Sequence, residues 1–150
     1  MKILDLYLED SRNISRWEKN YTDREFYALN RNIRKKLDAL LVVERKLSGR
    51  EIWMAGMIYQ HGFTLSSSKK ALCLAERAYE EGYKKAKTLI AQATDRFLQL
   101  QGKPQKFGTQ IVKLKSGRLK MYKIDGTVTD AQRKEYGLPS LKILKSYLNS

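Results

Sequence analysis

The single histidine of this 150-residue chain is the side chain best suited to proton transfer near neutral pH. Histidine has an ordinary pKa of about 6.5 and can therefore act as a general acid or base. His61 follows an apolar segment, residues 51–60, and precedes Gly62, so it is expected at a helix C-terminus, where the dipole favours a protonated ring. Asp95 could orient this ring as a carboxylate orients a catalytic base. The alternatives are that His61 caps the helix or fills a core position and that Asp95 pairs with a surface cation.

The loop over residues 102–110 is the densest group of polar and conformationally free residues in the chain. Loops held by a rigid scaffold often carry binding groups. Its spacing is not that of a Walker loop, and the residues after it alternate as in a strand rather than open a helix. We expect it to bind a polar, anionic ligand, the alternative being a well-ordered turn whose amides satisfy buried backbone groups. The candidate ligand-binding residues of the loop are Lys103, Gln105, Lys106, Gly108, Thr109 and Gln110.

Four short motifs resemble those of a widespread family of small, largely uncharacterised bacterial proteins. That family is marked by a Gln-His pair, an Asp-Arg pair, a Gly-x-x-Gln-x-Tyr-Gly-Thr-Gln loop and an Arg-x-x-x-Gly-Leu-Pro-x-Leu tail. The matching segments are Gln60-His61, Asp95-Arg96 and residues 102–110 and 128–141, with Phe107 where the family more often has Tyr. The resemblance spans residues 50–149 and implies no particular reaction. It does imply a shared site, to which His61, Asp95, Gln105, Gly108, Thr109 and Gln110 belong. Gln60, of the Gln-His pair, is a further candidate ligand-binding residue.

Residues 111–124 predict a β-hairpin, because apolar and polar residues alternate on both sides of Ser116-Gly117. A two-residue turn there places Lys113 opposite Lys120 and puts the apolar residues on the other face. An isolated hairpin is only marginally stable, so the apolar face is expected to pack on the helices. That face consists of Val112, Leu114, Leu119 and Met121.

The basic face of this hairpin is a second candidate site. Like charges directly opposite one another are unfavourable, and the phosphates of RNA or DNA would compensate them. A tyrosine on the second strand could stack on an unpaired base. The alternative is that a lysine-rich strand guards the hairpin edge from aggregation. The candidate nucleic-acid or anion-binding residues are Lys113, Lys115, Arg118, Lys120 and Tyr122.

The elements that must position these groups follow from spacing and capping signals. A capping box at Thr22–Glu25 begins a helix over residues 23–47, which Ser48-Gly49 ends, and Cys73 is expected to be a small buried hydrophobe. Further helices are expected over 51–60, 69–81 (capped by Ser66, Ser67 or Ser68), 84–101, 130–136 and from Pro139-Ser140 onward.

The predicted fold is mainly α, a compact multi-helix domain with one β-hairpin in the C-terminal half. We expect a single domain over residues 1–150. Its parts are an N-terminal arm or short helix (1–20), a helical core (22–101), a functional loop (102–110), the hairpin (111–124) and C-terminal helices (128–149).

The net charge and the residue composition indicate which class of partner to expect. Thirty Lys and Arg against sixteen Asp and Glu give a formal net charge of +14, which favours an acidic partner. One cysteine and one histidine exclude a disulfide framework and make a zinc site unfavourable, so no metal or cofactor is expected. Acidic residues interrupt the apolar N-terminus, which argues against a signal peptide or membrane association and favours a cytoplasmic protein.

Together these features favour a small protein that binds an anionic small molecule or modified biomolecule at His61 and the 102–110 loop, with metal-free acid–base catalysis there. One alternative is a module that binds RNA or DNA through the basic hairpin face. Another is an interaction domain for an acidic protein. The sequence assigns no substrate, reaction or oligomeric state.

Overall fold

The structure is a computed structural model that describes residues 1–20, 22–44 and 46–148. Within these residues it contains seven helices and one two-stranded antiparallel sheet. The predicted class, a mainly α domain with one β-hairpin in the C-terminal half, is confirmed. The helices are α1 (Ile3–Asn20), α2 (Asp23–Val43), α3 (Gly49–Gln60), α4 (Leu65–Glu80), α5 (Ala86–Leu100), α6 (Asp130–Glu135) and α7 (Leu141–Leu148), and the strands are β1 (Ile111–Lys113) and β2 (Leu119–Met121).

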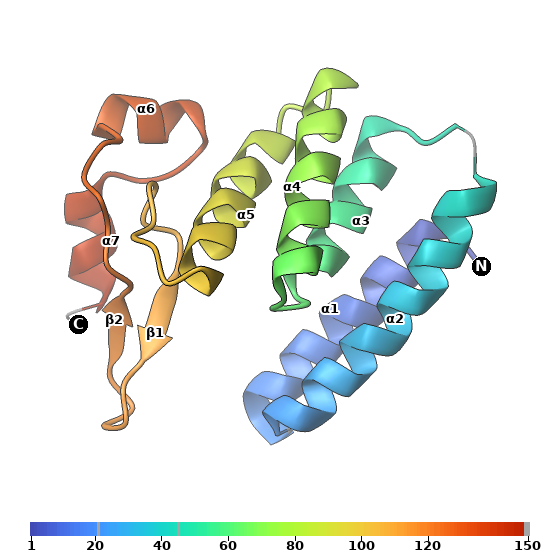
Figure 1. The fold of residues 1–150 in the computed structure, drawn as a ribbon, viewed down its shortest axis with the longest axis horizontal. Coiled ribbons are helices and arrows are strands. Elements are labelled where there is room, and N and C mark those ends of the chain that lie inside the picture. Colours follow the sequence, from blue (N-terminus) through green and yellow to red (C-terminus); the bar gives the residue numbers. More distant parts are fainter. Residues whose placement is uncertain (21, 45, 149–150) are drawn as a thin grey trace.

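The first five helices form the body of the molecule, and the hairpin, α6 and α7 lie together at one end (Figure 1). Helices α1 and α2 run side by side, α3 packs between them and α4, and α5 packs on α4. Small residues allow the close approach of α3 to its neighbours: a Cβ on Gly56 would lie only 2.9 Å from Leu89 Cδ2. The main core is formed by Ile3, Leu6, Ile33, Leu37, Met54, Ala55, Ile58, Tyr59, Ala71 and Ala93.

The N-terminal residues form a full helix rather than an arm or a short helix. Ile3 and Leu6 of α1 are buried in the main core, and the backbone N–H of Lys2 donates to Asp5 at 2.9 Å at the start of the helix. Asp10, on the same helix, is also buried and points a carboxylate into the protein. No helix among the described residues combines the length and apolarity that crossing a bilayer requires.

Two predicted helix boundaries are wrong, and capping explains both. The capping box at Thr22 is present, but α2 ends at Val43, and Ser48-Gly49 begins α3 instead of ending α2. A Cβ on Gly49 would lie 3.0 Å from the carbonyl oxygen of Ala78, so close packing requires this glycine, not a left-handed turn. The helix predicted over 69–81 begins earlier, at Leu65, because Thr64 is its cap and Ser67 completes a reciprocal capping box.

Cys73 is exposed on α4, so the prediction that it is a buried hydrophobe is wrong. The apolar positions around it in sequence divide between two faces of the helix. Ala71 and Ala75 point into the core, and Cys73 lies between them on the opposite side.

The hairpin has a different register from the predicted one. The structure pairs Ile111 with Met121, Val112 with Lys120 and Lys113 with Leu119, and the turn contains three residues, 115–117. Gly117 adopts a φ of +81°, as the last position of a three-residue hairpin loop requires.

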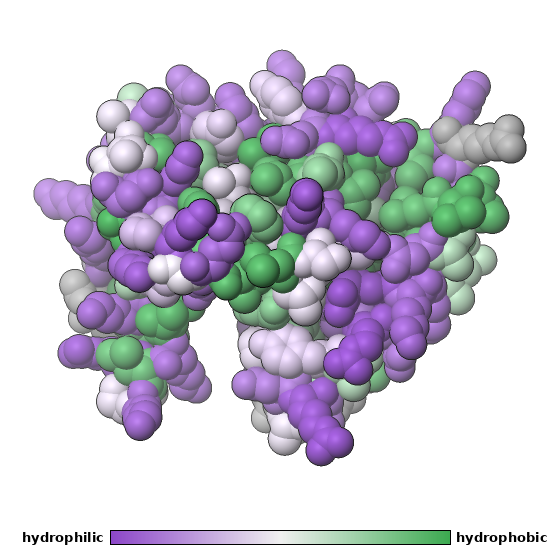
Figure 2. Space-filling model, in the orientation of Figure 1, coloured by the Kyte–Doolittle hydropathy of each residue, from purple (hydrophilic) through white to green (hydrophobic). Residues whose placement is uncertain are grey.

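A one-residue shift in register moves every side chain relative to its partner. The predicted pairs of like charge are therefore absent from the ladder, and neither face of the hairpin is wholly basic. The hairpin projects from the body, and a recess separates it from the neighbouring helices (Figure 2).

Cysteine pairs can test this register. Lys113 and Leu119 form a non-hydrogen-bonded pair, since the flanking ladder bond joins Leu114 to Arg118. In a Cys73→Ser background, we expect Lys113→Cys/Leu119→Cys to form an intramolecular disulfide on mild oxidation, because side chains are close at such pairs. Lys113→Cys/Lys120→Cys, matched to the predicted register, should stay largely reduced. Mass spectrometry after thiol alkylation distinguishes the two, and preferential oxidation of the second variant would contradict the observed register.

Candidate functional site

The 102–110 loop is organised around a single buried carboxylate. Asp95 of α5 is fully buried and accepts four hydrogen bonds from the loop. Its Oδ1 accepts from the backbone N–H groups of Lys106 (2.8 Å) and Phe107 (2.9 Å). Its Oδ2 accepts from the N–H (2.9 Å) and the hydroxyl (2.8 Å) of Thr109. The prediction that Asp95 orients His61 is wrong, because both oxygens of this carboxylate are bonded to the loop.

Gln105 stabilises the same loop from within. Its side chain is fully buried, with Nε2 donating to the carbonyls of Gln110 (3.0 Å) and Tyr122 (2.8 Å), and Oε1 accepting from the N–H of Gln110 (2.8 Å). Its backbone forms a parallel bridge with Ile124, just after the hairpin. The amide that the sequence assigns to ligand binding is thus used within the protein.

The other loop residues divide between the surface and the interior. Lys103 and Lys106 are exposed, while Gly108 has a φ of +81° and is enclosed. A Cβ on Gly108 would lie 3.2 Å from Leu141 Cδ2, so the loop also forms part of the surface on which α7 packs. The geometry therefore matches the alternative interpretation of this segment, a well-ordered turn whose amides are satisfied internally.

Replacing the central carboxylate should destabilise the protein. We expect Asp95→Asn to lower the free energy of unfolding by about 3 kcal/mol or more, because each buried donor left without an acceptor costs about 1–3 kcal/mol. Urea denaturation measures this loss. Glu80→Gln, at an exposed site on α4, is the control and should change stability by no more than about 0.5 kcal/mol. A loss below about 1 kcal/mol in Asp95→Asn would mean that the loop does not depend on this carboxylate.

His61 lies at the C-terminus of α3 and contacts a carboxylate that the sequence did not single out. Its Nδ1 lies 2.7 Å from Oδ2 of Asp10, which is 1% exposed, while the histidine side chain is 23% exposed. Asn30 of α2 donates from Nδ2 to the other oxygen of Asp10 at 2.9 Å and accepts from Nε of Arg34 at 2.8 Å. A continuous chain of hydrogen bonds therefore runs from His61 through Asp10 and Asn30 to Arg34.

This contact determines which ring nitrogen of His61 carries the proton in the neutral form. An ionised carboxylate can only accept, so Nδ1 must donate to Asp10 and Nε2 is left as the basic nitrogen. Long-range ¹H–¹⁵N NMR spectra of neutral His61 should show a protonated Nδ1. Asp10→Ala should remove this preference and shift the ring towards the Nε2–H form. A wild-type ring with its proton on Nε2 would contradict the assigned contact.

Beside His61, the turn between α3 and α4 forms one wall of a surface cavity of about 440 Å³. Two arginines of α2, Arg31 and Arg34, form part of the opposite wall. A Cβ on Gly62 would lie 3.1 Å from Arg34 Cζ and 2.6 Å from Ser67 Oγ, so the turn packs directly on this guanidinium. We call this cavity the arginine pocket; its lining consists of Tyr27, Arg31, Arg34, Gly62, Phe63, Thr64 and Leu100.

Phe63 has a strained backbone at the rim of the arginine pocket. Its φ of +52° lies in the left-handed region, which costs a non-glycine residue about 1–3 kcal/mol. The ring packs edge-on against Tyr27, with centroids 5.4 Å apart, and Arg96 Cζ lies 3.7 Å from its centroid. These contacts hold the ring between a tyrosine and a guanidinium.

Arg96 links this turn to the loop. Its Nη1 donates to the backbone carbonyl of Gln60 at 3.2 Å, and its Nε donates to Oε1 of Gln110. Burial lowers the pKa of Arg96 to about 10, against the opposing influence of Tyr27. Burial is also the largest cause that lowers the pKa of Arg34; the positive charge of Arg31 adds to it, while Tyr59, Asp38 and Asp10 oppose it.

The predicted site residues therefore fall into two connected groups. Gln60 is buried, donates from Nε2 to the carbonyl of Gln92 at 3.0 Å, and adjoins His61. Gln110 is buried in the loop and reaches the same carbonyl, at 3.4 Å, from its own Nε2. One group lies at the end of α3, at Gln60 and His61, and the other is the 102–110 loop; Arg96 bridges them. Neither His61 nor Gln105 lines any of the five described cavities.

The candidate nucleic-acid or anion-binding residues of the hairpin do not share one site. Lys113 lines a cavity against Trp17, Glu18 and Asp23, at the end of α1 and the start of α2. Lys115 lies in the turn, and the remaining three candidates line a separate cavity next to α7. They are Arg118, Lys120 and Tyr122.

Sequence reasoning missed Asp10, Arg34 and Arg133. Asp10 and Arg34 look like ordinary surface charges in an amphipathic pattern, and only the folded contact reveals them. Arg133 is 1% exposed and donates from Nε to the carbonyl of Phe107 at 3.1 Å and from Nη1 to that of Val128 at 2.9 Å. The sequence did offer one indication of Arg133, because this arginine is the first residue of the tail motif.

The described residues contain no group of three or more His, Cys, Asp or Glu side chains that could hold a metal ion. Comparison with known proteins found no matching family model, curated protein or solved structure. The resemblance to the family marked by the Gln-His pair and the glycine-rich loop therefore stays a prediction.

Proposed function

We propose that this protein binds a small organic anion in the arginine pocket. The observation that supports this most is that neither Arg31 nor Arg34, the two cations of the lining, forms an ion pair with an acidic side chain within the described part of the chain. Arg34 is half-buried, and cations withdrawn from water are normally paired. A phosphate or carboxylate would supply the missing partner, and arginine can bind either group through two parallel hydrogen bonds.

The walls of the pocket favour an anion that carries a planar or apolar group. Tyr27, Phe63 and Leu100 line it together with the arginines, and about 440 Å³ is a normal size for a small-molecule site. Lys103 and Lys106, which the sequence suggests for charge attraction, lie outside this lining and contribute only to the general positive field.

His61 borders the arginine pocket without lining it, and it is the candidate proton-transfer group of this proposal. Asp10 holds its ring in the manner in which a carboxylate orients a general base, and Gly62, the next residue, lines the pocket. Its role differs from the predicted one in the orienting partner, which is Asp10, and in the ligand-binding partners, which are arginines of α2 rather than amides of the loop.

Adenosine 5′-monophosphate and inorganic phosphate are suitable probes, since they share a phosphate and differ in the ring. We expect both to shift the NMR signals of the α3–α4 turn, with the nucleotide binding more tightly. Arg31→Gln, at an exposed position, should weaken binding about tenfold or more, because a hydrogen bond to a charged group contributes about 1.5–3 kcal/mol.

The matched control is Arg24→Gln on the same helix, which removes an equal charge outside the pocket. It should leave the affinity within about twofold, as expected for screened surface charges. Equal weakening of binding by Arg31→Gln and Arg24→Gln would mean that net charge alone causes the loss, and this would contradict a specific pocket. If neither probe binds, the proposal is also contradicted.

A further inference from the structure

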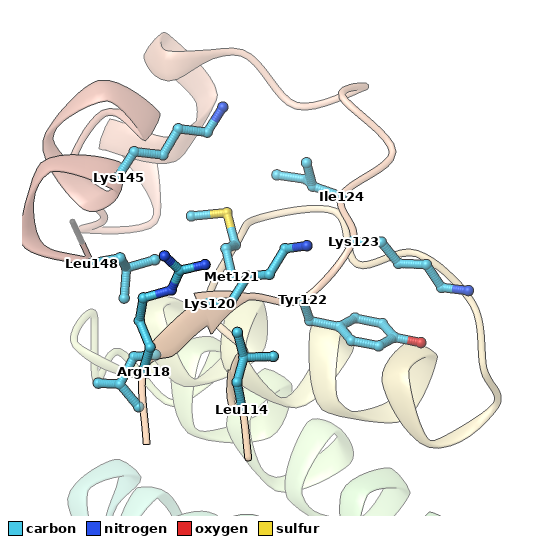
Figure 3. Close-up of a pocket in the computed structure, with 10 residues that line it drawn as sticks. Leu114, Arg118, Lys120, Met121, Tyr122, Lys123, Ile124, Lys145 and Leu148 are labelled. Carbon is cyan, nitrogen blue, oxygen red and sulfur yellow. The ribbon is translucent and has the colours of Figure 1, made fainter. Parts of the chain in front are cut away.

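A second cavity, independent of the arginine pocket, lies between the hairpin and α7. Helix α7 packs against β2, and the space beside them measures about 480 Å³. We call it the hairpin–α7 groove. Figure 3 shows side chains from β2, the preceding turn and α7 facing the same space.

The floor of the groove is aliphatic and incompletely covered. Leu119 is 48% exposed, and no residue of α7 is fully buried, although the helix is strongly amphipathic. An apolar surface left open in this way is typical of a protein interaction site. The aliphatic lining consists of Leu114, Leu119, Met121, Ile124 and Leu148.

Around this floor stand four cations: Arg118, Lys120, Lys123 and Lys145. No ion pair balances them within the described residues. The same region, residues 111–148, contains nine basic and only three acidic residues. The groove therefore combines an aliphatic floor with a positive rim.

The floor distinguishes between two classes of acidic partner. Proteins that bind single-stranded nucleic acid place aromatic rings where bases can stack. Among the described residues that line the groove, Tyr122 alone is aromatic, and its ring extends away from Met121 and Leu148 (Figure 3). Aliphatic side chains, including an adaptable methionine, instead suit the leucine-type anchors of an amphipathic helix.

We infer that the hairpin–α7 groove binds an acidic amphipathic helix of a protein partner. Its apolar residues, spaced three and four apart, would cover the aliphatic floor, and flanking carboxylates would pair with the rim. Attraction between the acidic helix and the rim speeds association and makes it dependent on salt, while the floor supplies the buried apolar area.

The test uses the full chain and a designed peptide of roughly 16 residues, long enough to form a helix, with leucines three and four apart and glutamates elsewhere. We expect binding by isothermal titration calorimetry and NMR shifts confined to the hairpin and α7. A scrambled peptide of equal composition should bind at least about tenfold more weakly, since it lacks a continuous apolar face.

Two variants separate the contributions of floor and rim. Leu119→Gln changes a half-exposed floor residue, and Lys120→Glu/Lys145→Glu reverses two rim charges; each should weaken binding of the designed peptide about tenfold or more. The control Lys35→Glu/Lys84→Glu makes the same change in net charge at exposed positions outside the groove and should have less than about threefold effect. Circular dichroism would confirm that all variants are folded.

Single-stranded RNA and vesicles containing anionic lipid serve as competing probes. Tighter binding of either one than of the designed peptide, with shifts at the same residues, would overturn the proposal in favour of that ligand. Equal binding of the designed and scrambled peptides, or loss in the rim variant with no loss in Leu119→Gln, would also overturn it, because the floor would then play no part. Failure of Arg31→Gln to alter phosphate binding would leave this inference untouched.

Discussion

The buried carboxylate of Asp95 is the interaction on which the C-terminal third depends. It accepts hydrogen bonds from three backbone N–H groups and one hydroxyl of a loop that has no regular secondary structure of its own. Without an acceptor at this position the interior of the loop would hold unsatisfied donors, which proteins avoid. With it, Gln105 donates to the carbonyl of Tyr122, just after β2, and Arg133 donates to the carbonyl of Phe107. One charge on α5 therefore fixes the loop, and the loop fixes the position of the hairpin and α6.

The positive charge of the molecule is concentrated in two regions with different surroundings. Near α3, the exposed Arg31 and the half-buried Arg34 line a cavity of small-molecule size together with the aromatic rings of Tyr27 and Phe63. Near α7, flexible lysines and one arginine surround aliphatic side chains. Arginine suits a fixed, paired contact with a phosphate or carboxylate, whereas lysine tolerates many geometries. The two regions thus differ in the type of anion each is suited to bind, even though both contribute to the same net charge.

The sequence predicted the helices and the hairpin because periodicity and capping are local properties. It located the capping box at Thr22 and the end of α3 at His61, where neighbouring residues carry the whole signal. It misassigned Gly49, whose requirement is space beside Ala78 rather than a left-handed turn. The predicted hairpin register was wrong because Ser116-Gly117 is compatible with a two-residue and with a three-residue loop, and a difference of one residue changes every pair.

The candidate site was predicted in part, in a way that reflects which contacts are local. Residue types directed attention to His61 and to the Asp95-Arg96 pair, but they did not reveal the partners of these residues in the fold. Asp10 lies 51 residues from His61 in sequence, and no spacing rule links them. The loop glutamines looked available for ligand binding because polar loop residues usually face water. In the fold, the side chain of Gln105 instead forms hydrogen bonds within the protein.

The route of the chain also determines the order in which the parts of the molecule can assemble. Helices α1 to α5 rest mainly on neighbours in sequence, and such local contacts form early in folding. The bridge between Gln105 and Ile124 and the Arg133 contact involve a loop that is bonded to Asp95, so they require α5 to be in place. We therefore expect the C-terminal third to order after the helical body, and a nascent chain to expose the aliphatic side chains and lysines of this third until α5 has formed.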